Sequence, residues 1–208
     1  MAKKESTLKN MLIALMVIAI VSGGVLGFVY GLTNERIDFN KKEKNESAIY
    51  NVLNLKKENK PVIKTIDHDT LVYNLAYTAD NQYIGAAIKT YSLNGFGGKI
   101  ELMIGILAND SINKVSVLSQ AETPGLGANM SKDGNKLMNS INNKSIDSIS
   151  TKTDNGYSVK VNKGKDKGKV DALTAATISS RAVCEAVEKA VNGFMANKDQ
   201  FLKGGNNE

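Results

Sequence analysis

The sequence predicts an α+β protein that has one N-terminal transmembrane helix. Three observations lead to this fold class: an uncharged apolar run near the N-terminus, paired strand-like stretches in the middle, and one amphipathic helix near the C-terminus. At 208 residues, the chain has room for one ordinary domain and an appendage. We therefore expect the following segments: an N-terminal segment (1–10), a transmembrane helix (11–32), a helical stalk (33–61), a mixed or antiparallel-sheet domain with flanking helices (62–203), and a flexible tail (204–208).

The apolar run at residues 11–32 contains no charged residue and no proline. A helix needs about 20 such residues to span a bilayer. Lys3, Lys4 and Lys9 precede the run, so the positive-inside rule predicts a cytoplasmic N-terminus and an extracytoplasmic main domain. A cleaved signal peptide is the alternative, but its apolar region is typically only about 7–15 residues long. We expect an uncleaved anchor in the cell (inner) membrane.

The segment after the anchor, residues 33–60, is rich in charged residues and is expected to form a helix leading away from the bilayer. Proline lacks a backbone N–H and cannot continue a helix, so Pro61 is expected to end it.

The middle of the chain contains two expected β-hairpins, and the first begins with alternating apolar residues at 71–77. Residues 71–77 and 83–89 form one expected pair, and residues 100–107 and 112–118 form another, each with an Asn/Asp turn between its strands. Weaker patterns indicate a helix within residues 132–142 and a short strand at 157–161.

The last helix is predicted from residue 178 to residue 195. Its apolar residues recur at steps of three and four, which places them on one helix face: Val183, Ala186, Val187, Ala190, Val191 and Phe194. Thr174 and Thr177 therefore lie at a helix N-terminus, where free N–H groups and the helix dipole favour a phosphate. Ala175 and Ala176 are small enough to let a bulky group approach the backbone. The alternative is that one of these threonines simply caps the helix.

Two glycine-containing loops adjoin the predicted strands. The first contains Gly97 and Gly98, just before the strand at residue 100, and the second is residues 122–127. Glycine permits positive φ and close approach by a ligand. Neither loop has the glycine spacing of a P-loop or of a dinucleotide-binding fingerprint, and an ordinary turn explains each loop taken alone.

Side-chain catalysis is poorly supported. The chain has one cysteine, Cys184, expected to be a buried structural thiol, and one histidine, His68, expected in a solvated turn. This content excludes an intrachain disulfide and a Cys-rich iron–sulfur site, and we expect no metal site. The net charge of +6 comes from scattered lysines without a basic stripe of stacking aromatics, so we expect no nucleic-acid binding. A bound cofactor would then supply the chemistry.

The anchor and three motifs together resemble the G subunit of the Rnf ion-translocating electron-transport complex and, more distantly, the C subunit of the Na⁺-translocating NADH:quinone reductase. The resemblance covers essentially the whole chain. The motifs are residues 95–98, residues 122–127 and residues 171–177, the last followed by Ile-Ser-Ser. The resemblance implies one covalently bound FMN per chain, joined through its phosphate to Thr177 by a separate flavin transferase.

Further site residues follow from the same resemblance. It places the isoalloxazine ring near the second motif, and the remaining motif residues become candidate cofactor-binding residues: Gly97, Gly98, Glu122, Thr123, Gly125, Leu126, Gly127, Asp171, Thr174, Ala175 and Ala176. The family usually has glycine where this chain has Ala175, and tyrosine where it has Phe96.

The function that the resemblance implies is electron transfer within a membrane-bound, ion-translocating (Na⁺ or H⁺) ferredoxin:NAD oxidoreductase. Its partners would be the lipid bilayer, the other membrane and peripheral subunits (A, B, C, D and E) and the flavin transferase. A stand-alone anchored flavoprotein and a non-redox membrane-tethered adaptor are the alternatives.

Overall fold

A computed structural model describes residues 7–56, 58, 61–68 and 70–203, which form two compact units, residues 1–44 and 45–208. The predicted tail at 204–208 and most of the N-terminal segment at 1–10 lie outside the described residues. The first unit contains most of helix α1 (Leu8–Val52), including the predicted span at 11–32. Among the described residues, α1 is the one helix long and apolar enough to cross a membrane.

Helix α1 ends at Val52, nine residues before the position expected from Pro61. Asn54 adopts a left-handed φ of 53°, and the N–H of Leu55 reaches back to the carbonyl of Tyr50 at 2.8 Å. This is a Schellman-type helix end, in which asparagine can replace the usual glycine. The asparagine therefore ends the helix, and Pro61 instead precedes the first strand.

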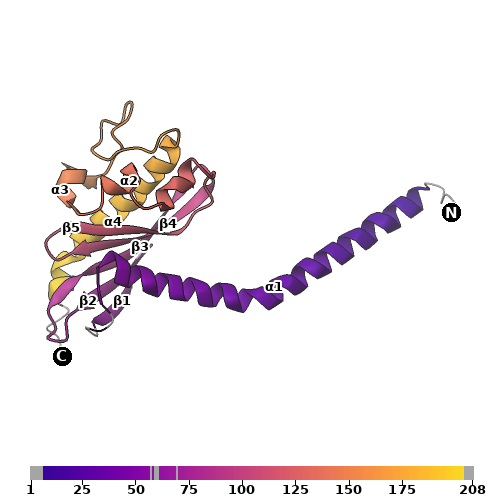
Figure 1. The fold of residues 1–208 in the computed structure, drawn as a ribbon, viewed down its shortest axis with the longest axis horizontal. Helices are drawn as coiled ribbons and strands as arrows, with labels where there is room; N and C mark the ends of the chain where they lie inside the picture. Colours follow the sequence, from indigo (N-terminus) through magenta and orange to yellow (C-terminus); the bar gives the residue numbers. More distant parts are fainter. Residues whose placement is uncertain (1–6, 57, 59–60, 69, 204–208) are drawn as a thin grey trace. The chain divides into compact units, whose positions relative to one another are not determined.

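The second unit is built on a six-stranded sheet in which every strand pairs antiparallel with its neighbour in the chain (Figure 1). The α+β prediction is confirmed, with an antiparallel sheet. The strands are β1 (Val62–His68), β2 (Leu71–Tyr77), β3 (Tyr83–Gly95), β4 (Gly98–Leu107), β5 (Ser111–Ser119) and β6 (Lys144–Ser145). The four strands of the two expected hairpins are β2 to β5, whereas β1 and β6 were not expected.

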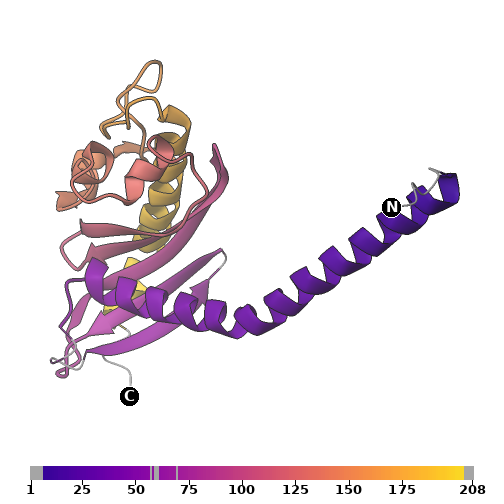
Figure 2. The same cartoon turned by 45° about the vertical axis from the view of Figure 1, so that its right-hand side comes forward.

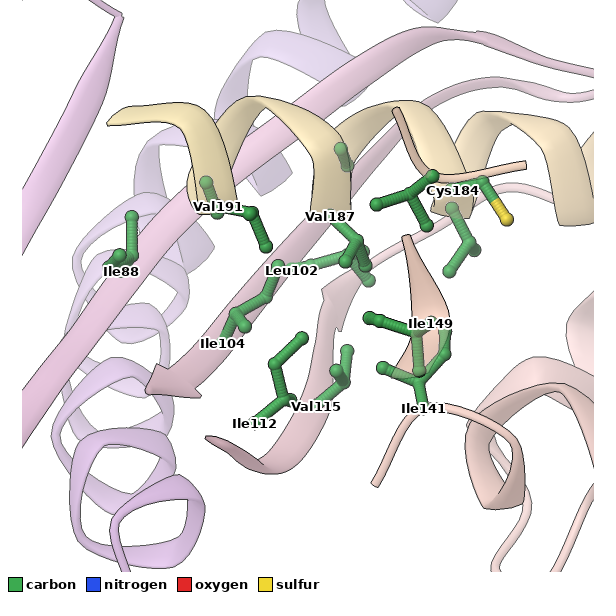
Figure 3. Packing of buried hydrophobic residues seen from close by; sticks show 14 of the residues in the cluster. Ile88, Leu102, Ile104, Ile112, Val115, Ile141, Ile149, Cys184, Val187 and Val191 are labelled. Carbon is green, nitrogen blue, oxygen red and sulfur yellow. The ribbon is translucent and has the colours of Figure 1, made fainter. Parts of the chain in front are cut away.

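Helix α4 (Thr177–Lys203) runs along one face of this sheet, as Figure 2 shows. The apolar stripe predicted for this helix is buried against the even-numbered residues of β3 and β4. Figure 3 shows Val187 and Val191 of α4 above Leu102 and Ile104 of β4, with Cys184 buried as expected. This packing places the N-terminus of α4 at the end of the sheet where the β3–β4 turn lies.

The opposite face of the sheet is covered by the last residues of α1. Val52 and its apolar neighbours pack on the odd-numbered residues Ala87 and Met103. Gly105 makes close contact possible, since a Cβ there would clash with the Val52 carbonyl. That carbonyl accepts a 2.7 Å hydrogen bond from the side-chain amide of Asn113.

Short elements connect β5 to α4: η2 (Gly127–Ser131), α2 (Lys136–Asn139), α3 (Ile146–Ile149), β7 (Thr151–Thr153) and β8 (Gly156–Ser158). The helix expected within 132–142 is thus a single turn. The strand expected at 157–161 is β8, which pairs with β7 and ends at Ser158. His68 is exposed as expected, but it ends strand β1 rather than lying in a turn.

Candidate functional site

The three motifs meet at one pocket of about 320 Å³ at the N-terminal end of α4. Small-molecule sites in proteins typically start at about 300 Å³. The pocket is lined by Phe96 from the β3–β4 turn, by Glu122, Thr123, Leu126 and Gly127 from the segment after β5, by Ala175 and Ala176 from the turn before α4, and by Thr177, Ile178 and Ser179 from the first turn of α4. Segments that lie far apart in the chain therefore form one site.

Thr177 is the first residue of α4 and is half-buried in the wall of this pocket. Its hydroxyl lies where the helix presents backbone N–H groups without intrahelical partners. In the part of the chain that the structure describes, no backbone N–H of α4 donates to the hydroxyl of Thr177 or Thr174. The Thr174 hydroxyl instead accepts from Lys136 Nζ at 3.2 Å. The capping interpretation is therefore not supported for either threonine.

Ser180 organises the turn that precedes Thr177. Its hydroxyl oxygen accepts a 2.9 Å hydrogen bond from the backbone N–H of Leu173, and its O–H donates to the carbonyl of Ala176 at 2.8 Å. Within this turn Ala175 has a φ of 57°. That left-handed conformation suits glycine better than an L-residue with a Cβ.

Glu122 joins the three motifs. The residue is 5% exposed; its Oε1 accepts a 3.0 Å hydrogen bond from the N–H of Gly97, and its Oε2 accepts one from the hydroxyl of Ser179. Gly127 leaves room for this arrangement, because a Cβ there would lie 2.5 Å from both Glu122 Oε2 and Ser179 Oγ. The β3–β4 turn, the loop after β5 and the first turn of α4 are therefore held together by one side chain.

The rim of the pocket is apolar and exposed. Phe96 is 69% exposed, Leu126 42% and Ile178 50%. Three large apolar side chains at one pocket, each facing solvent, are typical of a ligand site. The site thus offers an apolar rim for a planar group, and a helix N-terminus for an anion.

Seven of the candidate residues line the pocket: Glu122, Thr123, Leu126, Gly127, Ala175, Ala176 and Thr177. Gly97 lies in the adjoining β3–β4 turn, and Gly98, the first residue of β4, has a φ of 104°. Gly125 has a φ of 80° and lies with Thr174 in a neighbouring hollow. Asp171 lies in a further hollow beside Lys169.

The sequence reasoning did not propose Phe96, Ile178 or Ser179 as site residues, although all three line the pocket. Phe96 could have been recognised as a site residue from the sequence, because a large apolar residue between glycines in a tight turn has little chance of burial. Ile178 also falls outside the buried stripe of its helix. Ser179 could not have been recognised in this way, since its partner Glu122 lies 57 residues away in the sequence.

The titratable side chain that lines the pocket is Glu122, whose carboxylate oxygens both accept hydrogen bonds from the protein. Within the described ranges, no group of three or more His, Cys, Asp or Glu side chains is close enough to hold a metal ion. Cys184 is buried in the core, where desolvation by burial raises the pKa of its thiol to about 12. The site therefore suits a bound group that brings its own reactivity.

Comparison with known proteins supports this description. Residues 95–192 match the FMN-binding domain family, a range that includes all three motifs. The chain is 35% identical over 201 residues to the G subunit of an ion-translocating oxidoreductase complex of Vibrio cholerae, covering 93% of this chain and 92% of the relative. It is 28% identical over 216 residues to the corresponding G subunit of Pseudoalteromonas atlantica, covering 98% and 95% respectively.

A further relative extends the comparison to another type of complex. The G subunit of the proton-translocating ferredoxin:NAD(+) oxidoreductase complex of Clostridium ljungdahlii is 36% identical over 98 residues, which cover 47% of this chain and 46% of the relative. Together with the fold and the FMN-binding domain, these similarities show that the chain belongs to the family formed by the G subunits of ion-translocating oxidoreductase complexes.

Proposed function

We propose that this chain is the electron-carrying subunit of a membrane-bound, ion-translocating ferredoxin:NAD oxidoreductase complex, with one FMN joined through its phosphate to Thr177. One observation carries the proposal: Thr177 lies at the N-terminus of α4, in the wall of the pocket where the three motifs meet. The family membership supports the same conclusion.

The position of Thr177 suits a phosphodiester. Such a linkage keeps one negative charge, which a helix N-terminus stabilises by roughly 0.3–1 kcal/mol. Thr177 is only half-buried and lines the pocket, and the turn before it is closed by Ser180 rather than by Thr177. Covalent attachment would also prevent loss of the cofactor from an extracytoplasmic domain.

The other lining residues would hold the ring of the flavin. Phe96, Leu126 and Ile178 would shield it from water, and Thr123 would lie within the same pocket. FMN supplies reversible one- and two-electron transfer when it is bound. The chain itself binds and orients the ring and sets its electrostatic surroundings.

The remaining parts of the chain fit a subunit of a membrane complex. Residues 11–32 of α1 would anchor the protein in the inner membrane, with the N-terminus in the cytoplasm and residues 62–203 on the other side. The other subunits (A to E) would be its partners in electron transfer, and a flavin transferase would attach FMN.

Substitution of Thr177 tests the proposal. We expect the full-length protein, produced together with the flavin transferase, to fluoresce after denaturing electrophoresis and to carry the added mass of FMN less water. Thr177→Ala should abolish both signals, whereas Thr177→Ser should retain some attachment. Thr174→Ala is the matched control, three residues away, and should still be labelled. Flavin retained by Thr177→Ala would refute the assignment.

A further inference from the structure

We infer that Glu122 is a positioning residue that assembles the flavin pocket and, through its charge, lowers the reduction potential of the ring held there. The inference rests on the proposed function, because it requires a flavin in the pocket. It concerns a side chain that binds other parts of the chain rather than the cofactor itself.

The geometry first assigns Glu122 a role in assembly. Its two carboxylate oxygens accept from two different segments, the N–H of Gly97 in the β3–β4 turn and the hydroxyl of Ser179 in α4. A Cβ at Gly95 would lie 2.6 Å from Glu122 Oε1, so the turn packs directly on the carboxylate. Loss of this side chain would leave a buried cavity between the segments that line the pocket.

Both carboxylate oxygens are placed as hydrogen-bond acceptors, one from the N–H of Gly97 and one from the hydroxyl of Ser179. An ionised carboxylate offers only acceptors, so these contacts suit its charged form. In the described part of the chain, none of the ion pairs includes Glu122. Its charge is therefore balanced by dipoles rather than by a lysine or an arginine.

This charge, which no ion pair of the described residues includes, lies in the pocket lining beside an apolar rim. Charges interact more strongly where protein and ligand exclude water. Reduction of a flavin by two electrons with uptake of one proton adds one negative charge to the ring, and uptake of a second proton removes it. The Glu122 carboxylate repels that negative charge. It therefore opposes reduction and favours uptake of the second proton.

Glu122→Gln separates charge from assembly. A glutamine has nearly the same shape, its carbonyl still accepts from Gly97, and its amide can donate to the Ser179 oxygen. We expect the flavin-loaded, full-length variant in detergent to be easier to reduce. The equilibrium constant for two-electron reduction should rise about tenfold, which corresponds to about 30 mV. Reductive titration with dithionite against a reference dye measures this shift.

Two matched controls accompany this variant. Asp154→Asn removes an exposed carboxylate from the β7–β8 turn, outside the pocket, and should leave the potential unchanged. Ser179→Ala removes one hydrogen bond to Glu122 but keeps the charge, so its potential should not rise as that of Glu122→Gln does.

The assembly role is tested without flavin, in protein produced without the transferase. Glu122→Ala should lower the thermal midpoint, because Gly97 and Ser179 lose their partner, while Glu122→Gln should stay close to the unsubstituted protein. An unchanged or lower potential in Glu122→Gln, or failure of that variant to fold or to bind flavin, would overturn the inference. If the unsubstituted protein carries no flavin, the proposed function fails instead.

Discussion

The side-chain oxygen of Ser180 accepts a 2.9 Å hydrogen bond from the backbone N–H of Leu173, seven residues earlier in the chain. Both groups are buried, and the bond closes the turn that places Thr177 at the start of α4. A serine inside the helix thus determines the path of the backbone before the helix.

Ser180→Ala should therefore destabilise the domain. The Leu173 N–H would remain buried without its partner, and an unsatisfied buried donor costs about 1–3 kcal/mol. Denaturant unfolding of the full-length protein in detergent, followed by circular dichroism, measures the loss. Ser148→Ala, on the exposed side of α3, is the control and should change the free energy of unfolding by less than about 0.5 kcal/mol. Equal effects of the two substitutions would contradict the role assigned to Ser180.

Ala175→Gly should stabilise the protein. Ala175 has a φ of 57°, and a left-handed conformation costs an L-residue roughly 1–2 kcal/mol. Glycine removes that cost but loses about 0.5–1 kcal/mol through the greater freedom of its unfolded chain. We expect a net gain of about 0.5–1 kcal/mol in the free energy of unfolding. Ala196→Gly, at an exposed position within α4, should instead lose about 1 kcal/mol. A loss at both positions would contradict the strain at Ala175.

The sequence predicts the elements with strong periodicity. Every second residue of β2, and of residues 100–106 in β4, is apolar and packs in the same core as α4, and the stripe of small and branched apolar residues on α4 belongs to that core as well. Strand β1 does not alternate, since most of its residues are exposed at the edge of the sheet. Its pairing with β2 is a tertiary contact that periodicity does not reveal.

The site was only partly predictable for a related reason. Thr177 and Leu126 lie in motifs whose residues are adjacent in the chain, so the motifs identify them. The contacts of Glu122 with Gly97 and Ser179 connect positions 25 and 57 residues apart. No local pattern encodes such pairs, and they become visible only when the fold brings the three segments together.

The free energy of unfolding should fall at alkaline pH, in part because of Cys184. Burial raises the pKa of this thiol from its ordinary value of 9.0 to about 12. Between these values the unfolded chain loses the proton while the folded protein keeps it. Stability is therefore fully present below about pH 9 and is lost as the pH rises toward about 12. In the Cys184→Ala variant, the free energy of unfolding should fall less steeply with rising pH, by up to about 1.4 kcal/mol per pH unit.

Denaturant unfolding at several values between pH 8 and pH 11 measures this slope. Burial also raises the pKa of Tyr77 and Tyr83, so the variant should still lose some stability with rising pH. The comparison uses the slopes rather than the absolute stabilities, because alanine also removes a buried sulfur. Identical slopes in the two proteins would show that Cys184 does not contribute.

Phe96→Tyr should quench the fluorescence of the bound flavin. Phe96 lines the pocket and is largely exposed, so a hydroxyl on its ring should be tolerated. A phenol is oxidised far more easily than a benzene ring, and it transfers an electron to a photoexcited flavin when the two rings are in contact. We therefore expect a several-fold fall in fluorescence per bound flavin. Leu93→Tyr is the control, since Leu93 is similarly exposed on β3 of the same hairpin but does not line the pocket. It should leave the fluorescence nearly unchanged, and an equal fall in both variants would show that Phe96 does not face the ring.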